Sequence, residues 1–508
     1  MTELELFFSK YRENIVGNDA YFESPFGLQK LLYADWIASG RMYRPIEEKM
    51  CHLFGPLIGN THSEASETGT SMTHAYKLAH QIIKQHVNGN DSDAILTTGT
   101  GMTGVVNKFQ RMLGLRMPQL RQGPKGKFTT DEQEAFDKVL PPQRRPVVFV
   151  THLEHHSNHT SWIETIADVV VLEPDENLLV SPEELERQIA KYADRPLKIG
   201  AFSACSNVTG VIPPFYHLAR IMHQCGGYCF VDFAASAPYE NIDMHPADAL
   251  ERLDAVMFSP HKFLGGPGSS GVLVFNRELY HSLVPDQPGG GTVSWTDRWN
   301  NYSYLDDVEL REDGGTPGFL QAIRAALSIR LKEEMGVARI KAREKELLEI
   351  VFNAFNQMPR LHILAQNVSE RIGVVSFYID RLHHNLIVRL LNDRYGIQVR
   401  GGCSCAGTYG HFLLAVDINT SHMITSRINS GDLSLKPGWV RLSLHPTMTN
   451  EELHLVIRAI REIIENIDVW SQDYQYSASS NEFFHKDFHR KDTQDFLPFF
   501  DFDAPKPC

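Results

Sequence analysis

A lysine in unusual surroundings follows a short apolar run of the sequence. Residues 255–258 read AVMF, and SPHK, residues 259–262, comes directly after them. Residues 265–271 then form a glycine-rich loop, which would allow the backbone to approach a ligand closely. If the apolar run is a strand of an α/β sheet, Lys262 lies at the sheet edge where ligands bind. Taken alone, the segment is equally explained as a surface lysine before a flexible hairpin.

A carboxylate ends a second apolar run, CFVD, at Asp232. Burial of a carboxylate is costly unless its charge is paired. The protonated pyridine nitrogen of a cofactor is one partner that would stabilise Asp232 and would also make that cofactor an electron sink. A helix N-cap or a metal ligand is the alternative role for this residue.

Two further polar segments follow apolar runs in the same way. EHHSN, residues 154–158, comes after VVFVT, and the imidazole of His155 could stack there on an aromatic ring. With His152 and His159 nearby, a metal site is the competing interpretation, but the spacing lacks an obvious set of carboxylate or cysteine ligands. GTGMT, residues 99–103, separates AILTT from a helix-like run, and a turn of small residues at a helix start suits a phosphate.

The elements that would position these residues can be predicted from periodicity. Short β-rich runs alternate with helix-like stretches between about residues 90 and 275: AILTTG, PVVFVT, DVVVLE, IGAFSA, CFVDFA, AVMFS and GVLVF. This alternation is typical of βαβ units and of a mostly parallel sheet covered on both faces. One helix is predicted to begin after Ser181 at Pro182, with Glu184 at the capping-box position, and to run to about Tyr192.

A smaller α+β domain is predicted after Thr316. We expect a long helical region over residues 319–357, a strand VVSFYI, a helix ending at Gly396, and a last helix that starts at a capping box from Thr449 to Glu452. The predicted organisation begins with a segment 1–30 that packs with the small domain. A large domain, 31–318, follows and contains an insertion at about 111–146. The small domain, 319–469, contains an insertion at about 412–437 and is followed by a tail, 470–508. The aromatic tail is expected to pack as an arm on a partner subunit.

The composition excludes several classes of protein. A chain of 508 residues with 42% hydrophobic content can bury a large core. The formal charge of −13 comes from 62 acidic and 49 basic residues mixed along the chain, which leaves no basic field for nucleic acid. The N-terminus lacks a basic signal region and no apolar run approaches about 18 residues, so we expect no membrane association and a cytoplasmic location. Seven cysteines without a CxxC pair favour reduced thiols.

Taken together, ordered segments of the chain resemble the class V aminotransferases of fold type I, which use pyridoxal 5′-phosphate (PLP), and within them the cysteine desulfurase and selenocysteine lyase branch. The segments are GNTHSEAS (59–66), GTGMTG (99–104), EHHSN (154–158), SNVTG (206–210), VDFA (231–234), SPHK (259–262), GGTP (314–317), RGGCSCAG (400–407) and VRLSL (440–444). The resemblance implies an α/β architecture with a mostly parallel, seven-stranded-type sheet in a large domain and a smaller C-terminal α+β domain.

The resemblance also implies which residues bind the cofactor. Lys262 would be the Schiff-base lysine and proton shuttle, Asp232 would pair with the pyridine nitrogen, and His155 would stack on the ring. The phosphate would be held by four residues of the same subunit: Thr100, Gly101, Ser259 and His261. Thr316 would reach the phosphate from the neighbouring subunit, which implies a homodimer.

A second set of residues would face the substrate. Arg441 would bind the substrate carboxylate through its planar guanidinium, and Asn207 would lie near both cofactor and substrate. His62 and Arg400 would also contact the substrate, and no metal is expected. One departure from the family is clear: relatives commonly read Asp-Gly-Ala-Gln where this chain has Ala235 in the glutamine position, so the bond from that glutamine to the phenolic oxygen of the cofactor is lost.

The reaction depends on a cysteine loop, residues 400–407. Relatives carry Arg-x-Gly-His-His-Cys-Ala there, which aligns Cys405 with the nucleophilic cysteine and puts Cys403 where a histidine usually stands. The resemblance implies that Lys262 moves the Cα proton, that the Cys405 thiolate attacks the sulfur of cysteine or the selenium of selenocysteine, and that alanine leaves a persulfide behind. A sulfur-acceptor protein would then be a further partner.

Three alternatives to this reaction stay open. In the first alternative the two cysteines have another role: they could be small buried residues, or the CxC pair could bind a soft metal or close a disulfide. The chain could also be a class V enzyme that acts on another amino acid as an aminotransferase, epimerase or lyase. A non-catalytic scaffold with the same fold is the third alternative.

Overall fold

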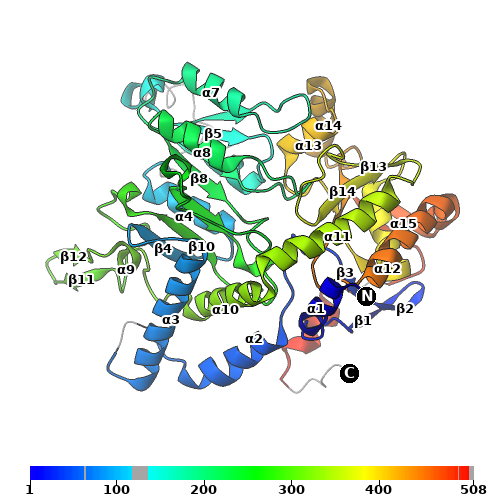
Figure 1. The fold of residues 1–508 in the computed structure, drawn as a ribbon, viewed down its shortest axis with the longest axis horizontal. Helices are drawn as coiled ribbons and strands as arrows, with labels where there is room; N and C mark the ends of the chain where they lie inside the picture. The colour runs from blue at the N-terminus through cyan, green and yellow to red at the C-terminus, as the bar shows by residue number, and fades with distance from the viewer. Residues whose placement is uncertain (62–63, 117–135, 490, 503–508) are drawn as a thin grey trace.

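A seven-stranded sheet forms the centre of the larger part of the protein (Figure 1). The computed structural model describes residues 1–61, 64–116, 136–489 and 491–502. The strand order is β4 (Asp93–Thr98), β10 (Gly271–Asn276), β9 (Ala255–Phe258), β8 (Tyr228–Asp232), β7 (Lys198–Ser203), β5 (Val147–Thr151) and β6 (Asp168–Leu172). β10 is antiparallel to β4 and β9, whereas the other neighbouring strands are parallel. The mostly parallel sheet predicted from the seven apolar runs is therefore confirmed.

Helices cover both faces of this sheet, as the continuous apolar strands require. The helices are α3 (Glu67–His86), α4 (Met102–Met112), α6 (Thr160–Ile163), α7 (Pro182–Lys191), α8 (Phe215–Gln224) and α10 (Phe319–Met335). Side chains of α3, α7, α8 and α10 share one buried core with the sheet, and those of α4 and α6 share the core on the opposite face. The carboxyl ends of the parallel strands border a cavity that residues of the smaller part also line.

The smaller part is built on a four-stranded antiparallel sheet. Its order is β13 (Leu361–Ile363), β14 (Val374–Ile379), β17 (Trp439–Ser443) and β16 (Arg400–Gly402). Four helices share its core: α1 (Glu3–Arg12), α11 (Val337–Phe355), α12 (His384–Tyr395) and α15 (Asn450–Trp470). The cysteine loop follows β16 at the edge of this sheet, and Arg441 lies on β17.

The predicted helical region 319–357 is two helices, because Gly336 interrupts it with φ +79°. The first of them, α10, packs along α3 on the large sheet, so the boundary predicted at residue 318 falls before a helix that belongs mainly to the larger core.

The predicted start of α15 and the predicted end of α12 are confirmed. Thr449 and Glu452 cap each other at the start of α15, and Gly396 ends α12 in the left-handed conformation. At α7, Ser181 accepts a hydrogen bond from Glu184 N–H at 3.1 Å as predicted. The Glu184 carboxylate, however, accepts from the Gln188 side chain at 2.5 Å instead of completing a capping box.

The N-terminal segment joins the two parts of the molecule. α1 packs on α11, and β3 (Leu32–Tyr33) pairs in parallel with β15 (Ile397–Gln398). A few residues later, Gly40 N–H donates to the carbonyl of His261 at 2.9 Å. The remaining short elements are the hairpin β1 (Tyr21–Ser24) and β2 (Gly27–Lys30), the hairpin β11 (Val293–Thr296) and β12 (Tyr302–Tyr304), α2 (Arg44–Lys49) and α9 (Val308–Arg311).

The first part of the tail packs against its own chain, and the expectation that the tail forms an arm on a partner subunit stays a prediction. This first part forms the hairpin β18 (Tyr474–Ser477) and β19 (Glu482–His485) beside α12. The Tyr474 hydroxyl donates to the Asp393 carboxylate at 3.0 Å, and Arg389 donates to the carbonyl of Phe483 at 3.0 Å.

The two predicted insertions are described to different extents. Residues 412–437 contain the end of α13 (Gly407–Leu413) and α14 (Ile418–Asn429), which buries none of its side chains. Much of the insertion at 111–146 lies outside the described residues.

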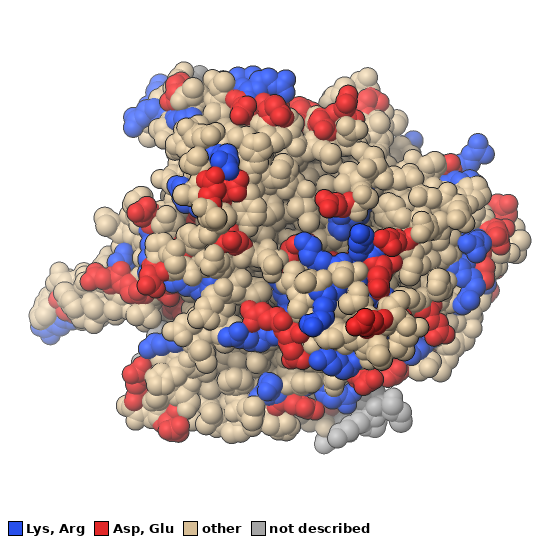
Figure 2. Space-filling model, viewed as in Figure 1, with Lys and Arg blue, Asp and Glu red and all other residues tan. Residues whose placement is uncertain are grey.

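Charged side chains of both signs are interspersed on the face shown in Figure 2. Within the described ranges, no helix combines the length and the apolar character needed to cross a bilayer.

Candidate active site

A cavity of about 310 Å³ lies where the carboxyl ends of the parallel strands meet the cysteine loop. Strands β5, β7, β8 and β9 end beside it, as the rule for open α/β sheets predicts. Its lining includes most residues predicted for the site, namely Thr100, Gly101, His155, Asn207, Asp232, Ser259, His261, Lys262, Arg400, Cys405 and Arg441. Segments from both ends of the sequence therefore converge on one cavity.

Lys262 and Asp232 form the electrostatic centre of the cavity. Lys262 ends a 3₁₀ turn after β9, and burial lowers its pKa from 10.5 to about 8, although the Asp232 carboxylate opposes this shift. Burial raises the pKa of Asp232, at the end of β8, to about 6, while the Ala234 N–H and the Lys262 ammonium oppose it. A lysine with this pKa has a much larger fraction of neutral amine near neutral pH than an ordinary lysine, and both nucleophilic attack and proton transfer require the neutral amine.

The reactivity of Lys262 is expected to rise with pH around a midpoint near 8. Below this pH the ammonium form dominates and does not react with acetic anhydride, whereas above it the neutral amine does. Mass spectrometry of the peptide that contains Lys262, after brief labelling of the cofactor-free protein at a series of pH values, measures the midpoint. In Asp232→Asn the midpoint should move lower, because the carboxylate that stabilises the ammonium is gone. A midpoint near 10.5 in the wild type would contradict the burial of the amine.

His155 is held as a neutral ring with a defined tautomer. Burial, and then the nearby Lys262 charge, lower its pKa to about 4. Ser157 N–H donates to His155 Nδ1 at 3.1 Å, and the Ser157 hydroxyl lies 3.1 Å from the same nitrogen. Nδ1 therefore acts as an acceptor, and the ring proton resides on Nε2.

The metal site considered for the histidine cluster is wrong. His152 Nε2 lies 3.1 Å from the carbonyl of Leu178, and His159 Nδ1 lies 3.3 Å from the Thr408 hydroxyl. His155 and His156 have the separate partners Ser157 and Gly407. The four rings do not converge, and no group of three or more metal-ligating side chains occurs in the described part of the chain.

The start of α4 borders the cavity at the place where the sequence predicts an anion site. Gly101 precedes this helix, and Met102 N–H donates to the Ser259 hydroxyl at 2.8 Å. A Cβ added at Gly101 would lie 3.1 Å from Ser259 Oγ and 3.4 Å from His261 Nε2. Glycine thus keeps open the space between the helix start and the SPHK turn, and the start of a helix is a favourable place for an anion.

A carboxylate missed in the sequence pairs with both predicted substrate arginines. Asp35 Oδ1 accepts from Arg441 Nη2 at 2.8 Å, and Asp35 Oδ2 accepts from Arg400 Nε at 2.9 Å. Arg441 is only 3% exposed, its Nη1 donates to the carbonyl of Asn207 at 3.2 Å, and its Nε is buried without a partner. Asp35 therefore sets the orientation of Arg441. Asp35 precedes the first of the family segments quoted from the sequence, and no local pattern marks it.

The cysteine loop exposes Cys405, whereas Cys403 is half-buried. Ser404 and Cys405 have φ values of +54° and +57°, and this left-handed conformation costs about 1 kcal/mol or more for each non-glycine residue. Asn207 Nδ2 donates to the carbonyl of Ser404 at 2.8 Å. Asn207 Oδ1 is buried and has no hydrogen-bond partner, so it remains available to a ligand.

Two predicted residues are not part of the described cavity. His62 lies outside the described residues. Thr316 is exposed and does not line the cavity of its own chain. Among the lining residues that were not predicted is Cys205, two positions before Asn207. It is buried, and burial raises the pKa of its thiol well above the usual range. The Cys205 thiol is therefore a neutral part of the cavity lining.

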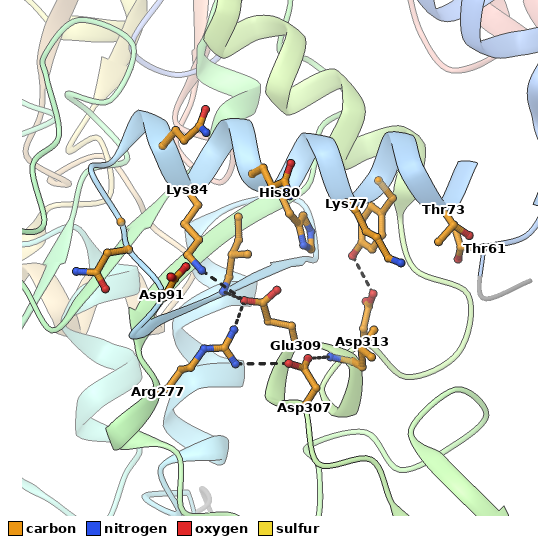
Figure 3. A pocket seen from close by; sticks show the side chains of 17 residues that line it. Thr61, Thr73, Lys77, His80, Lys84, Asp91, Arg277, Asp307, Glu309 and Asp313 are labelled. Atoms are coloured by element: carbon orange, nitrogen blue, oxygen red, sulfur yellow. Dashed lines mark hydrogen bonds and ion pairs between the residues drawn. The ribbon is translucent and has the colours of Figure 1, made fainter. Parts of the chain in front are cut away.

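A second cavity, of about 570 Å³, lies beside α3 and contains none of the predicted site residues (Figure 3). Lys84 and Arg277 both point toward Glu309, at 3.9 Å and 2.7 Å, and Arg277 also lies 3.7 Å from Asp307. These charges pair with one another and do not define a ligand.

Comparisons with known proteins agree with this geometry. The family model "Aminotransferase class-V" matches residues 129–456. A probable cysteine desulfurase from Halobacterium salinarum is 27% identical over 385 residues, which cover 75% of this chain and 83% of the relative. A probable cysteine desulfurase from Pyrococcus abyssi is 24% identical over 453 residues and covers 86% of this chain and 96% of the relative.

Solved structures show the same fold. The apo structure of a cysteine desulfurase from Thermococcus onnurineus has a TM-score of 0.69 at 21% identity and covers 90% of this chain and 98% of that one. The cysteine desulfurase CsdA from Escherichia coli has a TM-score of 0.67 at 20% identity, with the same coverage. The predicted architecture, fold type I, is thereby confirmed, and because the family model spans well over half of its length, this chain belongs to the class-V aminotransferase family.

Proposed function

We propose that the protein is a PLP-dependent cysteine desulfurase or selenocysteine lyase, which takes sulfur or selenium from L-cysteine or L-selenocysteine and releases L-alanine. One observation carries the proposal: the exposed thiol of Cys405 lines the same cavity as the buried Lys262 amine and the buried Arg441 guanidinium. The names of the similar proteins, which are cysteine desulfurases, support it.

The cavity fits PLP on three grounds. The buried Asp232 carboxylate suits a protonated ring nitrogen. The open space at Gly101 suits a phosphate, with Thr100, Ser259 and His261 around it. The unpartnered Asn207 Oδ1 would accept a hydrogen bond from a bound ligand. When bound, PLP would supply an aldehyde that reacts with amines and a ring that withdraws electrons from the substrate.

The protein's own groups would then divide the work. Lys262 Nζ, with its pKa of about 8, accepts the Cα proton and returns it later. Arg441, oriented by Asp35, binds the substrate carboxylate, with Arg400, Asn207 and His62 beside it. Cys405 Sγ attacks the substrate sulfur, the carbon–sulfur bond breaks, the carbon product takes a proton and leaves as alanine, and the sulfur stays on Cys405 as a persulfide.

Partners and location follow from the same proposal. Thr316 is exposed and serves the phosphate site of a neighbouring subunit, which makes the enzyme a homodimer. The exposed Cys405 can pass its sulfur to an acceptor protein. The six described cysteines are free, in keeping with work in the cytoplasm.

Another class V reaction is the second candidate, because two family groups are replaced. Ala235 lines the cavity where relatives place a glutamine, and Cys403 stands in the place of a histidine. Both changes alter groups near the reacting atoms, so an aminotransferase, epimerase or lyase acting on another amino acid would show itself by its products.

The test is incubation of the PLP-loaded protein with a panel of amino acids that includes cysteine and selenocysteine. Alanine, sulfide or selenide, and keto acids are measured together. Equal amounts of alanine and transferred sulfur are expected from cysteine in the presence of a thiol. Sulfide without alanine would identify β-elimination, and a keto acid without sulfide would identify an aminotransferase. A protein that stays colourless after incubation with PLP would indicate a scaffold.

A further inference from the structure

The strained cysteine loop makes two hydrogen bonds to His156, which lies in the turn after β5. His156 N–H donates to the carbonyl of Cys405 at 2.8 Å, and Gly407 N–H donates to His156 Nε2 at 2.9 Å. One bond is made by Cys405 itself, and the other is made two positions later by Gly407. A Cβ added at Gly407 would lie 3.1 Å from His156 Nε2, so the backbone of the loop approaches the imidazole closely.

The segment that carries His156 is itself fixed. The neighbouring Glu154 carboxylate is buried and accepts hydrogen bonds from Thr151, Asn158 and Ser203, at 2.6–3.2 Å. His155, between Glu154 and His156, lines the cavity beside Lys262. A single rigid turn after β5 therefore places both the ring that faces the cofactor site and the ring that holds the cysteine loop.

His156 is suited to accept from Gly407 N–H. Burial, and then the positive charge of Lys436, lower the pKa of its ring. The neutral ring leaves Nε2 as an acceptor and carries its proton on Nδ1. Asn207 holds the loop at a third point through the carbonyl of Ser404.

We propose that His156 is a positioning residue for the nucleophile: it holds the Cys405 loop in its left-handed conformation, so that the thiol lines the cavity beside Lys262. The inference rests on the proposed desulfurase function, because it concerns the step in which Cys405 attacks. It assigns a role to the second histidine of EHHSN, which the proposed chemistry leaves unused. His156 touches the loop backbone, so it acts through Cys405.

The test compares three variants of the full-length, PLP-loaded protein. His156→Leu removes the ring acceptor, whereas His156→Gln keeps a side-chain oxygen that can accept from Gly407 N–H. His217→Leu, at an exposed position on α8, is the control. Two quantities are measured: the single-turnover rate of persulfide formation on Cys405 by mass spectrometry, and the hydrogen–deuterium exchange of peptides covering residues 400–410. Cysteine binding is followed separately by the absorbance change of the bound cofactor.

In His156→Leu, persulfide formation should fall and loop exchange should rise by about ten-fold each, the effect of losing one hydrogen bond of ordinary strength. Cysteine binding should change by less than about two-fold, because Arg441 and Asp35 are untouched. His156→Gln should recover most of both quantities, and His217→Leu should match the wild type.

Wild-type rates and exchange in His156→Leu would overturn the proposal. A second result would also overturn it: His156→Gln is as defective as His156→Leu, retains less cofactor than the wild type and unfolds at a lower temperature. That result would show that His156 has a structural role alone. If the wild type forms neither alanine nor persulfide from cysteine, the desulfurase function fails instead. The exchange comparison still decides in that case whether His156 holds the loop.

Discussion

Replacement of Lys262 by alanine is expected to lower alanine release from cysteine by at least about a thousandfold, because no other described amine lies where it could take the Cα proton. The visible absorbance of the lysine-linked cofactor should disappear from the same variant. Both effects follow from the position of Lys262, a buried amine with a pKa of about 8 beside Asp232. Steady-state alanine formation and an absorbance spectrum after loading with PLP measure them.

Two companion variants separate chemistry from folding. Lys262→Arg keeps a positive charge near Asp232 but cannot form the covalent link, so it should be as inactive as Lys262→Ala while unfolding at a temperature close to that of the wild type. Lys191→Ala, at the exposed end of α7, should be fully active. Turnover of Lys262→Ala within about ten-fold of the wild type would exclude Lys262 as the proton carrier.

Replacement of Cys405 by alanine is expected to lower persulfide and alanine formation by on the order of a thousandfold, because the sulfur atom then has no acceptor on the protein. Binding of cysteine should survive, since Arg441 and Asp35 are unchanged. The absorbance change on adding cysteine measures binding, and the mass of the peptide containing residue 405 measures the persulfide.

Cys403→Ala is the matched control, because it removes the other thiol of the same loop. Its side chain is half-buried against the large core, so it should lose activity only slightly. A Cys403→Ala variant that is as inactive as Cys405→Ala would show that the two thiols act as a pair. Sulfide release at the wild-type rate from Cys405→Ala would exclude the persulfide and leave β-elimination as the reaction.

The large sheet and most of the site could be predicted from the sequence. The strands of this sheet are buried on both faces, so each appears as an unbroken apolar run with its polar residue at the end. Asp232 and Lys262 could therefore be placed at the same edge without knowledge of the strand order. The family pattern added Cys405 and Arg441, for which local sequence offered only weak signals.

The rest depends on contacts between distant segments. Asp35 accepts a hydrogen bond from Arg441, 406 positions away in the sequence, and no local sequence pattern predicts such a pair. The left-handed conformation of Ser404 and Cys405 contradicts the intrinsic preference of both residues and is maintained by His156 and Asn207. The packing of the tail hairpin β18–β19 beside α12, with Tyr474 buried, depends in the same way on a surface that exists only in the folded chain.

The bond between Asp35 and Arg441 has a consequence for the way the protein is made. A ribosome synthesises Asp35 near the beginning and Arg441 near the end, so the large sheet can fold around Lys262 long before the second arginine emerges. During that time the Asp35 carboxylate lacks its partner Arg441, and the side of the cavity that Arg441 lines is missing. Competence for turnover should therefore appear late in folding, as a slow step after the secondary structure has formed, because contacts so distant in sequence form last.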